Sequence, residues 1–147
     1  NPALAEDSFR RSIEIEPSAE ALNDLAWILN MQGRNEEAEK AVRKALELDE
    51  TNAGAWDTLG VLLMQKGELE DAQRAIGRSL SLFQGSPESF LHMAEVLALQ
   101  GRADQAAELL DFLSEQSRYL SAGQQDKLTR IRTLIADDNK ESAVGRQ

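Results

Sequence analysis

The stretch that decides the fold is residues 53–86, AGAWDTLGVLLMQKGELEDAQRAIGRSLSLFQGS. Each half repeats apolar and small residues at helical spacing, with Trp56-x2-Leu59-Gly60-x2-Leu63 in the first half and Ala72-x3-Ile76-x2-Ser79 in the second. Residues three or four positions apart share one face of an α-helix, so each half predicts a helix with one buried face. Gly67 lies between the halves and can adopt the left-handed conformation that closes a helix at low cost. The stretch therefore predicts two helices joined by a tight turn.

The same pattern recurs on both sides of this stretch. Gly33 and Gly101 each stand 34 residues from Gly67. The flanking copies read Leu22-x2-Leu25-Ala26-x2-Leu29 with Ala38-x3-Val42-x2-Ala45, and Phe90-x2-Met93-Ala94-x2-Leu97 with Ala106-x3-Leu110-x2-Leu113. A repeat of this length is typical of helical solenoids, in which each unit buries its apolar face against its neighbours. We therefore expect three full units, at 19–52, 53–86 and 87–120.

The unit resembles the tetratricopeptide repeat, a helix-turn-helix unit of 34 residues with the pattern W-x2-L-G-x2-Y...A-x3-F...P. The resemblance is specific in its period and covers most of the chain. It implies an all-α fold, a right-handed α-solenoid of helix-turn-helix hairpins, whose concave groove is lined by the first helix of each unit. It also implies a module that binds other proteins.

Local signals agree with this assignment. Ser86 and Asn52 are predicted to cap the first helices of their units, because their side chains can accept hydrogen bonds from free amides. One small residue in each helix is predicted to mark the close approach of the two helices of a hairpin: Ala26, Gly60 and Ala94 in the first helices, and Ala38, Ala72 and Ala106 in the second. A bulky residue at any of these positions would force the pair apart.

The beginning of the chain carries half a unit. Residues 2–17 show the second-helix pattern Ala5-x3-Phe9-x2-Ser12 and a closing proline, without a first helix before them. We therefore expect a fragment of a longer array, in which Leu4, Phe9 and Ile13 have lost part of their cover. Two copies could cover these residues against each other, which predicts a weak homodimer through the half unit.

The end of the chain departs from the repeat. Residues 121–138 place Leu128, Ile131, Leu134 and Ile135 on one stripe, and predict a helix that caps the stack. Residues 139–147 have no periodicity and are predicted to be disordered. The expected domain is thus one solenoid over residues 1–138.

Composition limits the partners and the chemistry that the chain can have. The net charge of −10 argues against nucleic acid as a partner and favours a neutral or basic protein segment. No apolar run is long enough to cross a bilayer, and no signal peptide is recognisable, so we expect a soluble chain without direct membrane insertion. The absence of cysteine excludes thiolate chemistry and leaves cytoplasm and periplasm equally open.

Catalytic signals are missing from the sequence. His92 is the single histidine and is expected to be a half-exposed surface residue, and no nucleophile accompanies it. The glycines are evenly spaced and do not cluster, so no phosphate-binding loop is expected. Acidic pairs such as Glu36-Glu37 are interpreted as solvated helix starts. We expect no enzyme, no cofactor and no metal site.

Candidate binding residues are those of the first helices that lie off the buried stripe, since these would face the groove. This criterion selects Glu20, Asn23, Asp24, Trp27, Asn30 and Met31 in the first unit, Asp57, Thr58, Val61, Met64 and Gln65 in the second, and Glu88, Leu91, His92, Glu95, Ala98 and Leu99 in the third. Trp27 is the leading candidate, because tryptophan is enriched in binding hot spots. The alternative is that the apolar members only pack between neighbouring first helices.

The family resemblance allows this chain to be compared with repeats that bind one specific ligand. Repeats that capture acidic chaperone tails use lysine, arginine and asparagine as a carboxylate clamp. This chain has Asn23, Trp27, Thr58, Glu88 and His92 at the corresponding positions. We therefore expect a partner segment with apolar anchors and basic residues.

Two functions follow as hypotheses. The first is a non-catalytic scaffold that holds a peptide or helix of a partner in the groove. The alternative is a structural spacer or self-assembly segment of a larger protein, whose groove binds nothing in particular. The sequence is similar to long bacterial repeat arrays of envelope systems.

Overall fold

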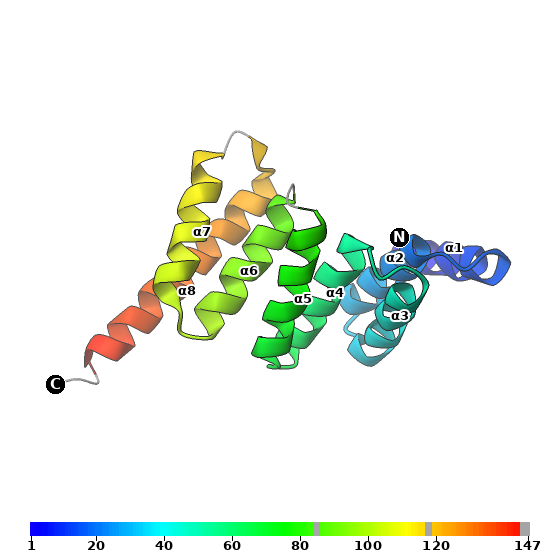
Figure 1. Ribbon diagram of the computed structural model, residues 1–147, viewed down its shortest axis with the longest axis horizontal. Coiled ribbons are helices and arrows are strands. Elements are labelled where there is room, and N and C mark those ends of the chain that lie inside the picture. Colours follow the sequence, from blue (N-terminus) through cyan, green and yellow to red (C-terminus); the bar gives the residue numbers. More distant parts are fainter. Residues whose placement is uncertain (84–85, 117–118, 145–147) are drawn as a thin grey trace. The chain divides into compact units, whose positions relative to one another are not determined.

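Helices form the secondary structure of the residues that the computed structural model describes, which are 1–83, 86–116 and 119–144. No strand occurs in these ranges, and the predicted all-α class is confirmed. The chain divides into two compact units, Asn1–Gln84 and Gly85–Gln147, and each is described by itself. Figure 1 labels their helices.

Unit 1 consists of one helix followed by two hairpins. Its helices are α1 (Pro2–Ile15), α2 (Ala19–Met31), α3 (Asn35–Leu48), α4 (Ala53–Gln65) and α5 (Leu69–Leu82). α2 pairs with α3 and α4 with α5, while α1 packs against α2. α4 contacts both helices of the preceding hairpin, so within unit 1 the hairpins stack on each other as in an α-solenoid.

Unit 2 consists of one hairpin and a long terminal helix. α6 (Pro87–Leu99) pairs with α7 (Ala103–Glu115), and α8 (Ala122–Val144) packs against both. The core that these helices share contains Leu91, Ala94, Leu110, Leu113, Leu120, Leu128 and Ile131. α8 thus covers the hairpin with Leu128, Ile131 and Ile135 of the predicted apolar stripe, whereas Leu134 is 40% exposed.

The limit of α8 differs from the sequence prediction. The helix continues past residue 138 to Val144, because no proline or glycine interrupts it before Gly145. This corrects the predicted start of the tail at residue 139, and residues 145–147 lie outside the described residues.

The three hairpins turn in the same way. Gly33, Gly67 and Gly101 have φ angles of 76°, 82° and 74°, in the left-handed region. Each glycine N–H donates to the carbonyl three residues back, and the next N–H donates to the carbonyl five residues back, at 2.9–3.0 Å. This is the Schellman arrangement, which satisfies the last carbonyls of the first helix. The predicted glycine turns are confirmed.

The predicted close approach of paired helices is also confirmed. The alanines at these positions in the three hairpins are fully buried. In the middle hairpin, a Cβ atom added to Gly60 would collide with the side chain of Ile76 and lie 3.2 Å from the carbonyl oxygen of Ala72. Asn52 and Ser86 accept hydrogen bonds from the third residue of α4 and α6, as predicted for N-caps.

Candidate functional site

In unit 1, most of the predicted groove residues remain accessible. On α2, Trp27 is 40% exposed and Met31 is 70% exposed. Glu20 is exposed as well, while Asn23, Asp24 and Asn30 are half-buried. On α4, Asp57 and Met64 are half-buried and Gln65 is exposed, but Thr58 and Val61 are buried.

In unit 2, the centre of the predicted set is buried. Leu91 is fully buried, and His92 is only 2% exposed, so the expectation of a half-exposed histidine is wrong. The reason is tertiary, because α8 packs against α6 and Leu91 belongs to the core that the two helices share. A partner cannot reach the buried side chains of Leu91, His92 and Val61. Glu95 is half-buried, and Leu99 remains exposed.

Two acidic residues of α6 are paired with a lysine of α8. Lys127 of α8 places its Nζ atom 3.4 Å from Oε1 of Glu88 and 3.6 Å from Oε2 of Glu95. Oε1 of Glu88 is also 3.5 Å from Nε2 of His92. Sequence reasoning missed this role of Lys127, because no local spacing relates residue 127 to residues 88 and 95. The α6 carboxylates are therefore partly neutralised within unit 2.

The acidic residues of α2 lack such a cation. In the part of the chain that the structure describes, the carboxylates of Glu20 and Asp24 make no hydrogen bond and no ion pair. Burial raises the pKa of the Asp24 carboxyl, and the charge of Glu20 raises it further. Uncompensated negative charge therefore accumulates on this helix.

Charge and apolar surface lie side by side on α2. Glu20, Asp24, Trp27 and Met31 follow one another at helical spacings of three and four residues, so they form one stripe. We call these four residues the acidic α2 face. Asn23 lies beside it and against α4, since its Nδ2 atom would be 3.4 Å from a Cβ atom at Gly54. The Oδ1 atom of Asn23 is buried and accepts no hydrogen bond from the described residues.

The described residues contain no group of three or more histidine, aspartate or glutamate side chains arranged to hold a metal ion. None of their helices combines the length and the apolar character that crossing a membrane requires. The acidic α2 face is thus the candidate site.

Comparison with known structures places the fold. A crystal structure of MamA protein has 23% sequence identity and a TM-score of 0.65, covering 82% of this chain and 69% of that chain. A second crystal structure of MamA has 18% identity and a TM-score of 0.63, with coverage of 94% and 88%. The first TPR of Spaghetti (RPAP3), bound to the HSP90 peptide SRMEEVD, has 13% identity and a TM-score of 0.68, with coverage of 81% and 96%. These likenesses show a shared helical-repeat fold.

Sequence comparison identifies the repeat itself. A search of curated protein sequences found no match. Three family models, each described as a tetratricopeptide repeat, match residues 1–53, 29–90 and 87–111. These matches cover the half unit, the hairpins of unit 1 and most of the α6–α7 hairpin. The chain belongs to the tetratricopeptide repeat family.

Proposed function

We propose that the chain is a non-catalytic interaction module whose acidic α2 face binds a basic, partly apolar segment of another protein. The observation that carries this proposal is a pair of carboxylates, Glu20 and Asp24, that have no ion-pair partner among the described residues and lie beside the exposed Trp27. A lysine or arginine of the partner would supply the missing charge, and its apolar residues would cover Trp27 and Met31. Asn30, Asp57 and Met64 of unit 1 are secondary contacts in this proposal.

The charge of the face favours a ligand unlike that of one structural neighbour. The Spaghetti repeat is bound to SRMEEVD, a peptide with three acidic residues. In this chain, Glu20 and Asp24 would repel such a peptide, and of the five clamp positions Thr58 and His92 are buried. We therefore propose the opposite charge preference for the partner.

The test uses two synthetic helical peptides with the same leucines, one with lysine and arginine and the other with glutamate at the charged positions. We expect calorimetry to detect only the basic peptide, with an affinity that falls as salt rises, because salt screens the carboxylates. Trp27→Ala should weaken binding about tenfold or more, as for a central anchor. Leu48→Ala, which removes an exposed apolar side chain of α3, is the matched control and should bind like the parent.

Three outcomes would contradict the proposed binding function. Equal binding of the acidic peptide, or parent-like binding by Trp27→Ala, would exclude the acidic α2 face as the site. Absence of binding by either peptide at any salt concentration would favour the spacer alternative.

A specific observation supports self-assembly as a second candidate function. α1 exposes 68% of Leu4 and 86% of Ile15. Two copies can cover these side chains in a two-fold contact, the commonest arrangement of homo-oligomers. In this proposal, the contact is weak because α1 offers few apolar side chains.

A further inference from the structure

α1 is attached to unit 1 differently from the other helices. None of its described side chains is buried; Ala5, Phe9 and Ile13 are half-buried where α1 packs against α2. The helices α2, α3, α4 and α5 each contribute several buried residues. Since apolar stabilisation scales with the area removed from water, the contact of α1 with α2 contributes less apolar stabilisation than the contacts within the hairpins.

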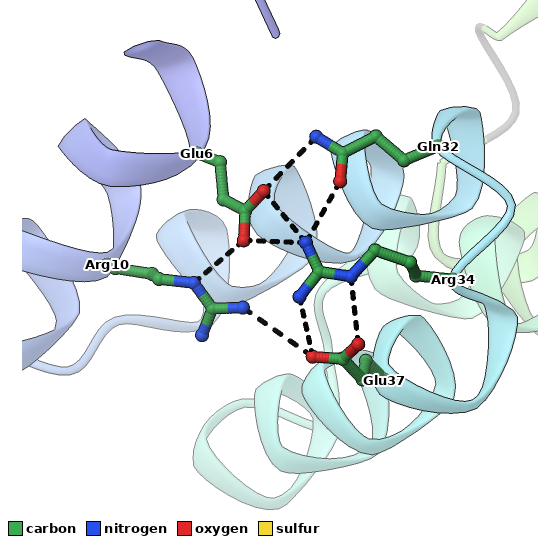
Figure 2. A network of polar contacts seen from close by, with 5 residues as sticks. All are labelled: Glu6, Arg10, Gln32, Arg34 and Glu37. Atoms are coloured by element: carbon green, nitrogen blue, oxygen red, sulfur yellow. Dashed lines mark hydrogen bonds and ion pairs between the residues drawn. The ribbon is translucent and has the colours of Figure 1, made fainter. Parts of the chain in front are cut away.

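An ionic network joins α1 to the following hairpin (Figure 2). Glu6 of α1 accepts hydrogen bonds from Nη1 of Arg34, at 2.9 Å to each carboxylate oxygen, and from Nε2 of Gln32 at 3.1 Å. Arg10, one turn further along α1, donates from Nε to Glu6 at 2.9 Å. The Glu6 side chain is only 15% exposed, so these contacts are partly shielded from solvent.

Arg34 is the residue that spans the junction. It lies in the α2–α3 turn and donates to Glu6 of α1 and, through Nε and Nη2, to both carboxylate oxygens of Glu37 of α3 at 2.8 and 2.7 Å. Its Nη1 atom also bonds Oε1 of Gln32 at 3.0 Å. Arg10 approaches Glu37 to 3.7 Å from the other side. The guanidinium fork thus links α1, the turn and α3 in a geometry that a lysine cannot reproduce.

The next junction has a similar ion pair in a different setting. Glu39 of α3 pairs with Lys66 of the α4–α5 turn at 3.1 Å and with Arg43 at 2.8 Å. Glu39 follows Ala38 as Glu6 follows Ala5, so the acid occupies the same position of the unit. However, α3 also buries Ala38, Ala41, Val42 and Ala45. The ion pair there adds to a packed interface, whereas the network at α1 adds to a contact in which α1 buries none of its described side chains.

We infer that α1 is an ion-latched helix: it undocks as one element at high ionic strength while α2–α5 stay folded, and Arg34 holds the latch. Undocking uncovers the side of α2 against which α1 packs. The latch is therefore a conformational device that opens one side of unit 1 without unfolding it. This inference is independent of the proposed binding function, because it concerns the attachment of α1 alone.

The test is amide hydrogen exchange on the full chain, measured by mass spectrometry at low and high salt. Glu6→Gln and Arg34→Gln should each speed exchange of α1 amides at least about threefold at low salt, as should high salt in the parent. Arg34→Lys should fall between Arg34→Gln and the parent, since it keeps the charge and loses the fork. In all of these cases, the protection of α2–α5 should not change.

Asp7→Asn is the matched control. Asp7 pairs with Arg11 at 2.9 Å across the same four-residue spacing, but this pair stays within α1. The substitution should leave α1 exchange at the parent rate, and thermal melting followed by circular dichroism verifies that every variant is folded. If Glu6→Gln, Arg34→Gln and high salt all left α1 as protected as it is in the parent at low salt, the latch would be overturned, because packing alone would then hold the helix. Simultaneous loss of protection in α1 and α2–α5 would also overturn it, because the helix would not open by itself.

Discussion

Burial raises the pKa of the Asp24 carboxyl, and Glu20 raises it further. A carboxyl group whose pKa is higher in the folded state than in the unfolded state lowers the stability of the protein once the pH exceeds its pKa in the unfolded state. We therefore expect Asp24→Asn to have a higher Tm than the parent at pH 7, by calorimetry, while its affinity for the basic peptide falls several-fold. Asp138→Asn, at an exposed position of α8, should change neither quantity. A lower Tm of Asp24→Asn, or an unchanged affinity for the basic peptide, would argue against the acidic α2 face as the binding site.

Glu6 shows the opposite shift. Hydrogen bonds from Arg10, and then from Arg34 and Gln32, lower its pKa from 4.5 to about 2. A carboxyl with a lowered folded-state pKa contributes stability that is fully present above its unfolded pKa of about 4.5 and is lost as the pH falls toward about 2. We expect α1 to lose exchange protection in this interval, after correction for the intrinsic pH dependence of amide exchange. In Glu6→Gln, the protection of α1 should be lower from the start and should fall less between these pH values; an identical pH profile would contradict the assignment.

At the scale of the element, Gly60 sets the distance between α4 and α5. Alanine at this position would raise helix propensity by up to about 1 kcal/mol but would collide with Ile76, and overpacking typically costs about 1–3 kcal/mol. Because Ile76 is fully buried and the carbonyl oxygen of Ala72 is close, neither neighbour can move freely. We expect Gly60→Ala to lower the free energy of unfolding, as measured by urea titration.

The control for this prediction is the same substitution in open space. Gly123 lies in the first turn of α8 and has no neighbouring atom within 4 Å of an added Cβ atom. Gly123→Ala should therefore leave stability unchanged or raise it by up to about 1 kcal/mol. If both variants were stabilised alike, the close approach of α4 and α5 would not constrain residue 60.

At the scale of the whole molecule, the exposed apolar residues of α1 predict weak self-association. Analytical ultracentrifugation should show dimers whose fraction rises with concentration, and Ile15→Glu should abolish them without loss of helix content. Ile15 is a sharper test than Phe9, because Phe9 is half-buried and its replacement would also disturb the attachment of α1. Met31→Glu, which changes an exposed apolar residue of α2, should dimerise like the parent. Dimers that persist in Ile15→Glu, or a parent that is monomeric at every concentration, would exclude this contact.

Local sequence was sufficient for the parts of the fold that depend on short-range physics. The period of the repeat located the helices, and the glycines at 33, 67 and 101 located their turns, because only the residue after the helix needs a left-handed conformation. Small residues predicted where paired helices meet, since a single Cβ atom decides whether two backbones can approach. These features depend on the residues themselves and on neighbours within one unit.

The tertiary structure decided which predicted surface residues remain accessible. Periodicity identifies the face of a helix but not the element that covers it, so Leu91 and His92 were assigned to the groove although α6 packs against α8. The partners of the charged residues were equally hidden from the sequence. Lys127 reaches Glu88 from another helix, and Arg34 reaches Glu6 across the junction with α1. Such contacts depend on how helices dock and how long side chains turn toward each other, which no local spacing specifies. Only the packed structure therefore distinguishes the acids of α6, which pair with Lys127, from those of α2, which pair with no cation in the described part of the chain.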